Sequence, residues 1–472
     1  MNKRFSSLSQ IQSAISESSI TLPELVRFYL SNIEANQHLN AFLEVFGDEA
    51  IEAAERIQSK ITEKKAGKLA GMVIAIKDNI IYKDHESNAS SKILKGFKSL
   101  YSSTVVERLL AEDAIIIGRT NCDEFAMGAS NENSAFGPVL NAADNSRVPG
   151  GSSGGSAVAV QADMCLASLG SDTGGSIRQP AAFTGIYGLY PTYGAISRWG
   201  LIAFASSFDQ IGPFTSSPED MALILNIMGG ADDHDATMIQ NHQFNIQIQE
   251  PVQALKIAYI KDCIEHEGLE PEIKQATISF IELLKSKGHT VEGIDFPYLD
   301  QMVPCYQVLT TAEASSNLSR FSGLTYGYRS PDAVDLESTF KKSRTQGFGA
   351  EVKRRIMLGT FVLTSDFYDA YYTKAQKVRR LIRNKTMDIF ENYDIILTPT
   401  TSTVAFKIGE KSSNPISMYL ADLFTVQSNL AGTPGLSVPF GTHPGNNMPI
   451  GMQLMGRPLQ EGLLIRLAAS LQ

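Results

Sequence analysis

Seven glycines lie within the 26 residues from Gly150 to Gly175, where average usage predicts about two. Glycine is needed where the backbone has a positive φ or where another group approaches the chain closely. Serines held in such loops, just before helices, either cap those helices or act as nucleophiles. The segment therefore predicts two tight loops that carry serines, namely Ser152, Ser153, Ser156, Ser168, Ser171 and Ser176.

Both loops can be placed relative to regular structure. Residues 150–156 precede a small-residue segment at 157–161, which is expected to be helical. Residues 165–169 are expected to form a short strand, out of which residues 171–176 turn. The backbone N–H groups of Thr173, Gly174, Gly175 and Ser176 can then converge on one point. Such a turn binds an anion, or forms an oxyanion hole in an acyl-transfer enzyme.

Other interpretations of the glycine segment compete with this one. A phosphate-binding loop would need a lysine directly after the glycines, and none follows. Residues 150–154 match G-x-S-x-G, but that nucleophile elbow follows a hydrophobic strand, whereas residues 141–149 are polar and end in proline. The elbow also needs a late histidine, and His443 is the only one beyond His289. A purely structural role, in which the serines cap helices and the glycines turn the chain, stays open.

Lys77 ends the apolar run at residues 73–76. A lysine at a strand end is ordinarily solvated. The run also resembles the V-A-I-K string of protein kinases, but the chain has no H-R-D or D-F-G triplet. Buried among serine hydroxyls, a lysine can be neutral and act as a base, if its pKa falls by roughly 3 units from about 10.4. Since His85 is the only histidine in residues 67–213, serine–lysine chemistry is favoured over a Ser-His-Asp triad.

Hydrophobic patterning predicts an α/β fold. Residues 73–76 and 114–117 are apolar runs typical of buried strands, and a helical pattern at 105–111 lies between them. Thr21, Pro23 and Glu24 form the start signal of a helix that reaches about residue 35, and residues 45–64 are expected to form a second helix. Further strands are expected at 256–260, 290–296, 394–397, 436–440 and 448–455, and further helices at 218–228, 272–287, 367–391 and near the C-terminus.

Charge, cysteine spacing and hydropathy exclude several classes of protein. The formal net charge of −9 disfavours broad non-specific binding to nucleic acid. Four cysteines without a C-x-x-C pair suggest neither a disulfide scaffold nor a thiolate metal site. Residues 1–21 lack the apolar core of a secretion signal, and no run reaches 18 apolar residues, so we expect a cytoplasmic protein with no membrane association.

The glycine loops carry a family resemblance. Residues 150–156 and 170–180 together resemble the amidase signature, and Lys77 and Ser176 lie 75 residues before and 24 residues after Ser152, as in that family. The resemblance implies an α/β fold with a central mixed, twisted sheet covered by helices on both faces. It covers roughly residues 20–470. We expect residues 1–64 to be a helical segment packed on a catalytic domain at 65–472, with a loop or insertion near 229–251.

The resemblance also implies roles for the serines and the lysine. Ser176 would attack an amide carbon, and Ser152 would pass the proton to Lys77. The oxyanion would be held by the N–H groups of Thr173, Gly174, Gly175 and Ser176. No metal or cofactor is expected in this chain.

Further strings resemble the A subunits of glutamyl-tRNA(Gln)/aspartyl-tRNA(Asn) amidotransferases, a branch of the same family. They lie at residues 121–128, 131–137, 203–207, 312–318 and 351–356. This implies a glutaminase that works with B and C subunits as a heterotrimer, in which a partner subunit uses ATP and Mg²⁺ and makes the main contacts with tRNA. Departures from the family pattern at Tyr190, 80–82 and 142–146 are expected to lie in surface or loop segments.

Three residues fall where the branch binds glutamine: Tyr306, Arg355 and Asp422. Arg355 would bind the α-carboxylate and Asp422 the α-ammonium, while Tyr306 would add a hydrogen bond. Arg355 on a solvated helix face beside Lys353 and Arg354, Asp422 as a surface acid and Tyr306 at the edge of the core remain alternatives. The competing functions are a stand-alone amidase for small amides and a catalytically inactive assembly subunit.

Overall fold

The computed structural model describes residues 5–240, 242–411 and 418–472. Its centre is one sheet of 11 strands in the order β1-β3-β2-β4-β6-β5-β10-β11-β9-β7-β8. The pairs β2–β3, β2–β4, β7–β8 and β7–β9 are parallel and the other pairs antiparallel, so the sheet is mixed. The strands are β1 Phe42–Val45, β2 Val73–Lys77, β3 Ile115–Thr120, β4 Ala167–Asp172, β5 Tyr187–Tyr190, β6 Gln210–Thr215, β7 Lys256–Ile260, β8 Thr290–Ile294, β9 Ile395–Pro399, β10 Gly435–Thr442 and β11 Pro449–Gly456.

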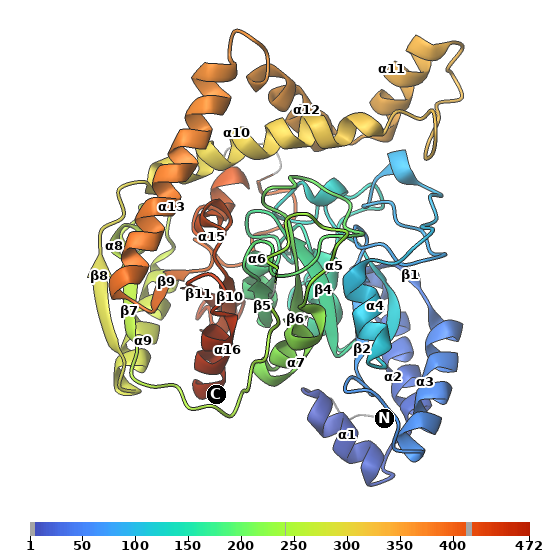
Figure 1. The fold of residues 1–472 in the computed structure, drawn as a ribbon, viewed down its shortest axis with the longest axis vertical. Helices are drawn as coiled ribbons and strands as arrows, with labels where there is room; N and C mark the ends of the chain where they lie inside the picture. Colours follow the sequence, from blue (N-terminus) through green and yellow to red (C-terminus); the bar gives the residue numbers. More distant parts are fainter. Residues whose placement is uncertain (1–4, 241, 412–417) are drawn as a thin grey trace.

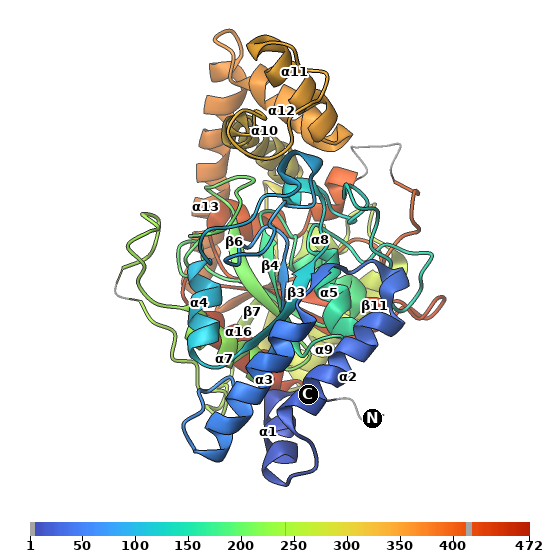
Figure 2. The ribbon, with the colours of Figure 1, turned by 90° about the vertical axis from the view of Figure 1, so that its right-hand side faces the viewer.

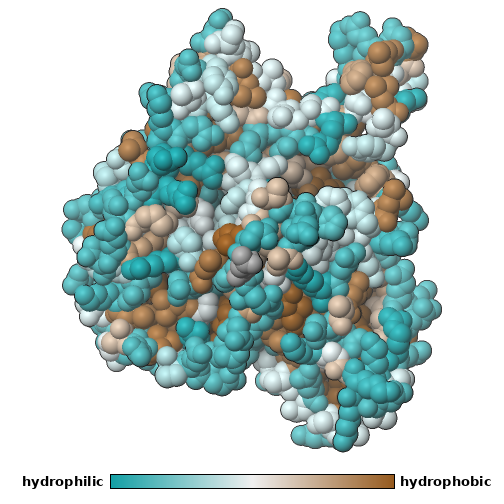
Figure 3. Space-filling model, viewed as in Figure 1, coloured by the Kyte–Doolittle hydropathy of each residue, from teal (hydrophilic) through white to brown (hydrophobic). Residues whose placement is uncertain are grey.

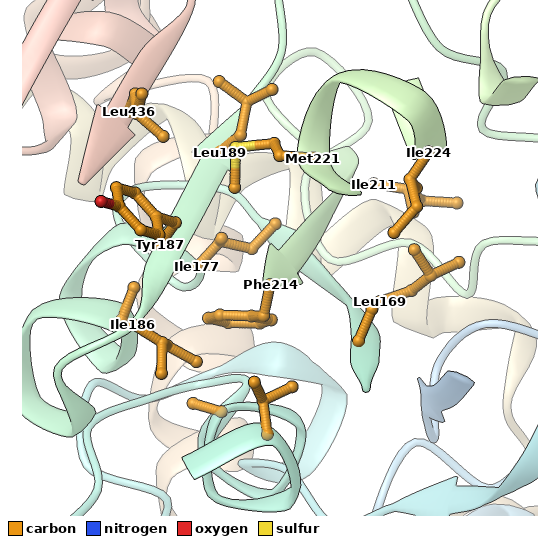
Figure 4. Packing of buried hydrophobic residues seen from close by; sticks show 14 of the residues in the cluster. Leu169, Ile177, Ile186, Tyr187, Leu189, Ile211, Phe214, Met221, Ile224 and Leu436 are labelled. Carbon is orange, nitrogen blue, oxygen red and sulfur yellow. The ribbon is translucent and has the colours of Figure 1, made fainter. Parts of the chain in front are cut away.

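Helices cover both faces of this sheet, which confirms the predicted fold class. On one face Ser168 Oγ of β4 donates to the Ser156 carbonyl of α5 at 2.7 Å. On the other face Leu169 and Ile211 lie toward Ile224 of α7 (Figure 4). The helices are α1 Leu8–Ser16, α2 Leu22–Ala35, α3 Gly47–Thr62, α4 Thr104–Ala111, α5 Gly154–Gln161, α6 Arg178–Thr184, α7 Pro218–Met228, α8 Lys261–Ile264, α9 Pro271–Ser286, α10 Leu299–Asn317, α11 Leu336–Gly347, α12 Ala350–Val362, α13 Lys374–Asn392, α15 Val426–Ala431 and α16 Glu461–Ser470.

The helices α10, α11 and α12 stand above the body of the sheet in both views, and α13 descends from them along one side (Figures 1 and 2). The parallel strands β2, β3 and β4 end below these helices, with Lys77, Thr120 and Asp172 as their last residues. In α/β sheets the space outside the carboxyl ends of parallel strands is where ligands bind. The glycine loop after β4 and the helix α10 therefore face each other at the edge where a site is expected.

The N-terminal segment needs one correction. The capping box at Thr21 and Glu24 is present at the start of α2, as predicted. Residues 1–64 are not purely helical, however, because β1 pairs antiparallel with β3 at the edge of the sheet. The helix expected from residue 45 begins at Gly47, since the chain is still extended up to Val45. The segment thus belongs to the sheet as well as to the helical layer.

The structure can also be compared with the predictions for residues 367–391 and 229–251. The helix predicted at 367–391 is divided into a π-helical turn, η5 (Tyr368–Thr373), and α13. The stretch at 229–251 contains no regular helix or strand among its described residues. None of the helices that the structure describes has the length and apolar character needed to cross a bilayer.

Candidate active site

Lys77 is fully buried at the end of β2. Its Nζ donates to Ser152 Oγ at 2.7 Å, Ser153 Oγ at 2.8 Å and Ser171 Oγ at 3.0 Å. β2 lies between β3 and β4 in the sheet, so its last side chain is enclosed by the loops that follow both neighbours. The simplest interpretation, in which Lys77 is a solvated lysine at the end of a strand, is therefore wrong.

Burial lowers the pKa of the Lys77 ammonium from 10.5 to about 8, although nearby acidic groups, Asp123 and Asp172 among them, oppose the shift. A pKa near 8 leaves a usable fraction of neutral amine close to neutral pH. The partners that surround the nitrogen are uncharged hydroxyls, which can pass protons without pinning the ammonium form as a carboxylate would. The environment of Lys77 is suited to a base.

The two glycine loops meet at this lysine. The Ser153 N–H donates to the Ser176 carbonyl at 3.2 Å, and the Gly151 N–H donates to Gln179 Oε1 at 2.9 Å. The peptide bond between Gly151 and Ser152 is cis. Neither α5 nor α6 is capped by a serine side chain, so helix capping does not explain the serines. Ser176 therefore lies next to the segment that contacts Lys77, and Lys77, Ser152 and Ser176 are all buried.

The second loop presents backbone N–H groups, with one correction. The Gly175 N–H donates to Asp172 Oδ1 at 2.8 Å and is not free to hold an oxyanion. The N–H groups of Thr173, Gly174 and Ser176 have no acceptor among the described residues. The loop is braced from one side by the Thr173 hydroxyl, which donates to Asp209 Oδ1 at 2.6 Å.

A buried ion pair between Arg178 and Asp172 stabilises the loop. Arg178 donates to Asp172 through Nε at 3.1 Å and through a terminal nitrogen at 3.0 Å, and both side chains are fully buried. Burial alone would raise the pKa of Asp172, but the charge and hydrogen bonds of Arg178, with Asn429, hold it below its ordinary value. Arg178 also donates to the Thr425 carbonyl and Gln453 Oε1, both at 2.7 Å. The pair ties the loop to α15 and β11.

Replacing Arg178 by leucine is expected to lower the free energy of unfolding by about 3–5 kcal/mol, because it leaves the Asp172 charge buried without its partner. Urea unfolding of the full chain measures the change. Arg466→Leu is the matched control, since Arg466 pairs with Glu250 at the surface, where a pair contributes about 0–1 kcal/mol. Equal losses in the two variants would contradict the assigned role of the buried pair.

The three residues expected to bind substrate lie against the same loop. A Cβ on Gly174 would meet the Tyr306 ring at 2.5 Å, and one on Gly175 would lie 3.3 Å from Asp422 Oδ1. Gly175 also has a φ of +143°, which side chains rarely allow. Glycine at these two positions therefore lets Tyr306 of α10 and Asp422 approach the backbone next to Ser176.

Arg355 is 5% exposed, not on a solvated face. Its Nε donates to Glu351 Oε1 at 2.8 Å, and its guanidinium lies 5.4 Å from the centres of the Phe204 and Tyr419 rings. Its two terminal nitrogens donate to no acceptor in the described parts of the chain. Burial raises the pKa of Asp422 to about 8, although the charge of Arg355 opposes the shift. A cation with free donors and an acid thus face the same space.

Some residues of the site are not identified by the sequence pattern. The pattern marks Ser153 and Ser171 only as loop serines, and both contact Lys77. Asn79 Nδ2 donates to Ser171 Oγ at 2.9 Å, and Thr425 Oγ1 donates to the Gly174 carbonyl at 2.5 Å. Glu351, which holds Arg355, stands four residues before it on α12, a spacing at which ion pairs form. That spacing is the one signal available in the sequence.

Tyr190 corrects an expectation. The sequence predicts it in a surface or loop segment, but it is fully buried in β5. Its hydroxyl donates to the Phe208 carbonyl at 3.2 Å, and the Arg178 guanidinium lies 5.0 Å from its ring centre. Ile80 and Ile81, two of the other departures, lie in a loop as predicted, although their side chains are buried. The departures from the family pattern therefore include the packing behind the site.

A buried amine among serine hydroxyls, beside a loop with free N–H donors, is equipped for acyl transfer through a serine ester. No three or more His, Cys, Asp or Glu side chains are grouped to hold a metal ion in the residues described. The geometry of this site suits serine–lysine acyl transfer without a histidine, the chemistry that the amidase resemblance implies.

The comparison with known families agrees with this resemblance. A family model described as Amidase matches residues 24–465. The chain therefore belongs to the amidase family and is an enzyme of that family.

Individual relatives are more specific. The chain is 47% identical to the A subunit of the glutamyl-tRNA(Gln) amidotransferase of Chlorobium phaeobacteroides, covering 99% of both chains. The crystal structure of the corresponding A subunit from Thermotoga maritima matches with a TM-score of 0.78 at 40% identity, covering 94% of this chain and 90% of that one. The peptide amidase of Stenotrophomonas maltophilia matches with a TM-score of 0.81 at 27% identity, covering 98% and 96%.

Proposed function

We propose that the chain is the glutaminase subunit of a tRNA-dependent amidotransferase. The observation that carries the proposal is that Asp422 lies beside Gly175 in the loop that holds Ser176, while the buried Arg355 keeps two terminal nitrogens without an acceptor among the described residues. A free amino acid carries a carboxylate and an ammonium, and this pair offers one complementary charge to each. The full-length similarity to amidotransferase A subunits supports the same assignment.

In the proposed reaction Ser176 Oγ attacks the side-chain amide carbon of glutamine. The Ser176 proton passes to Ser152 as the Ser152 proton passes to Lys77, whose Nζ lies 2.7 Å from Ser152 Oγ. The tetrahedral oxyanion accepts hydrogen bonds from the N–H groups of Thr173, Gly174 and Ser176, each worth about 3 kcal/mol. The C–N bond then breaks, and the proton held by Lys77 returns through Ser152 to the departing ammonia.

An acyl-ester remains on Ser176 after ammonia leaves. Water, deprotonated through the same Ser152–Lys77 relay, attacks the ester and releases glutamate. Throughout the cycle Arg355 holds the α-carboxylate and Asp422 the α-ammonium. Tyr306, which packs against Gly174, adds a hydrogen bond. The clamp fixes the amide carbon next to Ser176.

We infer that the ammonia is consumed by partner subunits. In this proposal B and C subunits complete a heterotrimer in the cytoplasm, where charged tRNA is used. A partner subunit binds most of the tRNA and uses ATP and Mg²⁺ to convert Glu-tRNA(Gln) to Gln-tRNA(Gln). This chain itself uses no cofactor.

The test is ammonia release from glutamine by the isolated chain, and then with partner subunits, ATP and Glu-tRNA. We expect turnover to rise when all components are present, and Gln-tRNA to form. A second candidate is a stand-alone amidase, favoured by the similarity to the peptide amidase. Fast hydrolysis of small aliphatic amides, unchanged by partners, would establish that candidate and refute the glutaminase subunit.

Arg355→Ala is expected to raise the KM for glutamine by about 10- to 100-fold, because it removes a charge-assisted hydrogen bond to the α-carboxylate. The kcat should change less. Lys353→Ala is the matched control, since Lys353 stands on the same helix and its Nζ donates to the Thr345 carbonyl rather than to Glu351. The KM of this variant should equal that of the wild type. Steady-state ammonia release measures both constants. An unchanged KM in Arg355→Ala would refute the carboxylate assignment.

A further inference from the structure

A groove lies outside the catalytic cluster, and its lining includes Ser207 and Arg379. Its volume is about 980 Å³, and it lies between α13 and the ends of α15 and β5. α13 runs along the left of the molecule in Figure 1, and Figure 3 shows mainly hydrophilic residues in that region. None of the described residues that line the groove is acidic. Its basic lining residues are Lys377, Arg379, Arg380 and Arg383.

The basic residues of this groove form no ion pair with any residue that the structure describes. α13 carries six basic and two acidic residues, in a protein with a net charge of −9. None of the six forms an ion pair with another described residue. Lys377, Arg380 and Arg383 are exposed and stand three residues apart, so they follow one side of the helix. The groove has the electrostatic character of a site for a negatively charged partner.

The apolar part of the groove indicates which kind of partner. Leu381 is 47% exposed at its rim, and Ile239, Ala431 and Pro458 contribute further apolar lining. At the start of α13 the turn η5 exposes Tyr368 and Tyr371 by 42% and 43%. A nucleic acid can stack its bases on tyrosine, but it offers little apolar surface to cover the aliphatic residues Leu381, Ile239 and Ala431. Arginine, tyrosine and aliphatic side chains together are typical of protein interfaces.

We propose that this groove docks an acidic, amphipathic segment of a partner subunit. The inference rests on the proposed function, which supplies the partner subunits. Acidic side chains of the segment pair with Lys377, Arg380 and Arg383, and its apolar side chains cover Leu381 and the groove floor. Rim charges of this kind speed association and fix the partner's register.

The inner wall of the groove touches the catalytic machinery. Arg379 donates to the Ser207 carbonyl at 3.0 Å, and its guanidinium lies 4.1 Å from the centre of the Phe208 ring. That ring meets the Tyr306 ring edge-on at 6.0 Å. Asp209, the next residue, accepts the hydrogen bond from Thr173. A segment docked in the groove therefore packs against the back of the chain segment that braces the oxyanion loop.

The experiment compares two triple variants in assembly with the purified partner subunits. We expect the Kd of assembly to rise by at least about 100-fold at physiological salt in the groove variant Lys377→Glu/Arg380→Glu/Arg383→Glu. The matched control, Lys274→Glu/Lys285→Glu/Lys287→Glu, reverses three charges in and just after α9 and should assemble like the wild type. Ammonia release by the isolated chains, which should be equal for all three proteins, shows that the variants are folded.

The outcomes separate the two proposals. If the wild type does not assemble with the partner subunits, the proposed function fails and the groove inference fails with it. If the wild type assembles and the groove variant assembles equally well, or both variants lose affinity alike, only the groove inference is overturned.

A photo-crosslinking residue at Leu381 identifies the occupant in the complete complex with tRNA. We expect a crosslink to a stretch of a partner subunit rich in Asp and Glu. A crosslink to tRNA, or none in an assembled complex, would overturn the inference.

Discussion

Replacing Ser176 by alanine should abolish glutamine hydrolysis, with a loss of about 10⁴-fold or more in kcat. In the proposed mechanism the acyl group is carried by Ser176 Oγ, which alanine lacks. The side chain is small and 6% exposed, so the substitution changes little else. The KM for glutamine should stay near that of the wild type, because Arg355 and Asp422 are untouched.

Ammonia release and the intact mass of the protein after rapid quenching measure this result. The wild type should show a glutamyl adduct and Ser176→Ala none. Ser168→Ala is the matched control: its hydroxyl is also buried and donates to the Ser156 carbonyl at 2.7 Å, but it does not touch Lys77. It should lose about 1 kcal/mol of stability and keep the adduct. An adduct that persists in Ser176→Ala would assign the nucleophile to another serine of the cluster.

Much of the fold could be predicted because several strands have continuous apolar runs. β2, β7 and the helix α7 lie where the pattern predicts them. The pattern does not predict β6, because Gly212 and Pro213 interrupt it and these residues normally weaken a strand. It does not predict α10 either, because this helix is buried on several sides and contains Pro304, so it has no single apolar stripe.

The candidate site could likewise be predicted only in part. Clustered glycines and a lysine after a buried strand are local signals, and they lead to the two loops and to Lys77. The hydrogen bond from the Gly175 N–H to Asp172 is not a local pattern, since it depends on how Arg178 and Asn429 hold that carboxylate. The burial of Arg355 between Phe204 and Tyr419 joins segments far apart in the sequence. Such contacts follow only from the folded chain.

Activity should depend on pH through Lys77, and Lys77→Ala should remove nearly all of it. The neutral amine is the active form, and burial lowers the pKa of Lys77 to about 8. Below that pH the ammonium has no lone pair to accept the proton from Ser152, so kcat should fall about tenfold per pH unit. Lys77→Met, which keeps most of the side-chain volume, should be as inactive as Lys77→Ala if the amine itself is required.

Measuring kcat and KM separately distinguishes Lys77 from the other group with a pKa near 8. Asp422 must be ionised to hold the substrate ammonium, and burial raises its pKa to about 8. Protonation of Asp422 at low pH therefore raises KM, whereas protonation of Lys77 lowers kcat at saturating glutamine, because kcat reports groups in the enzyme–substrate complex. A kcat that stays constant as the pH is lowered from 8 to 6, while KM rises, would show that Lys77 is not the base. Ser152 would then have to pass its proton to a different group, and none of its described contacts offers one.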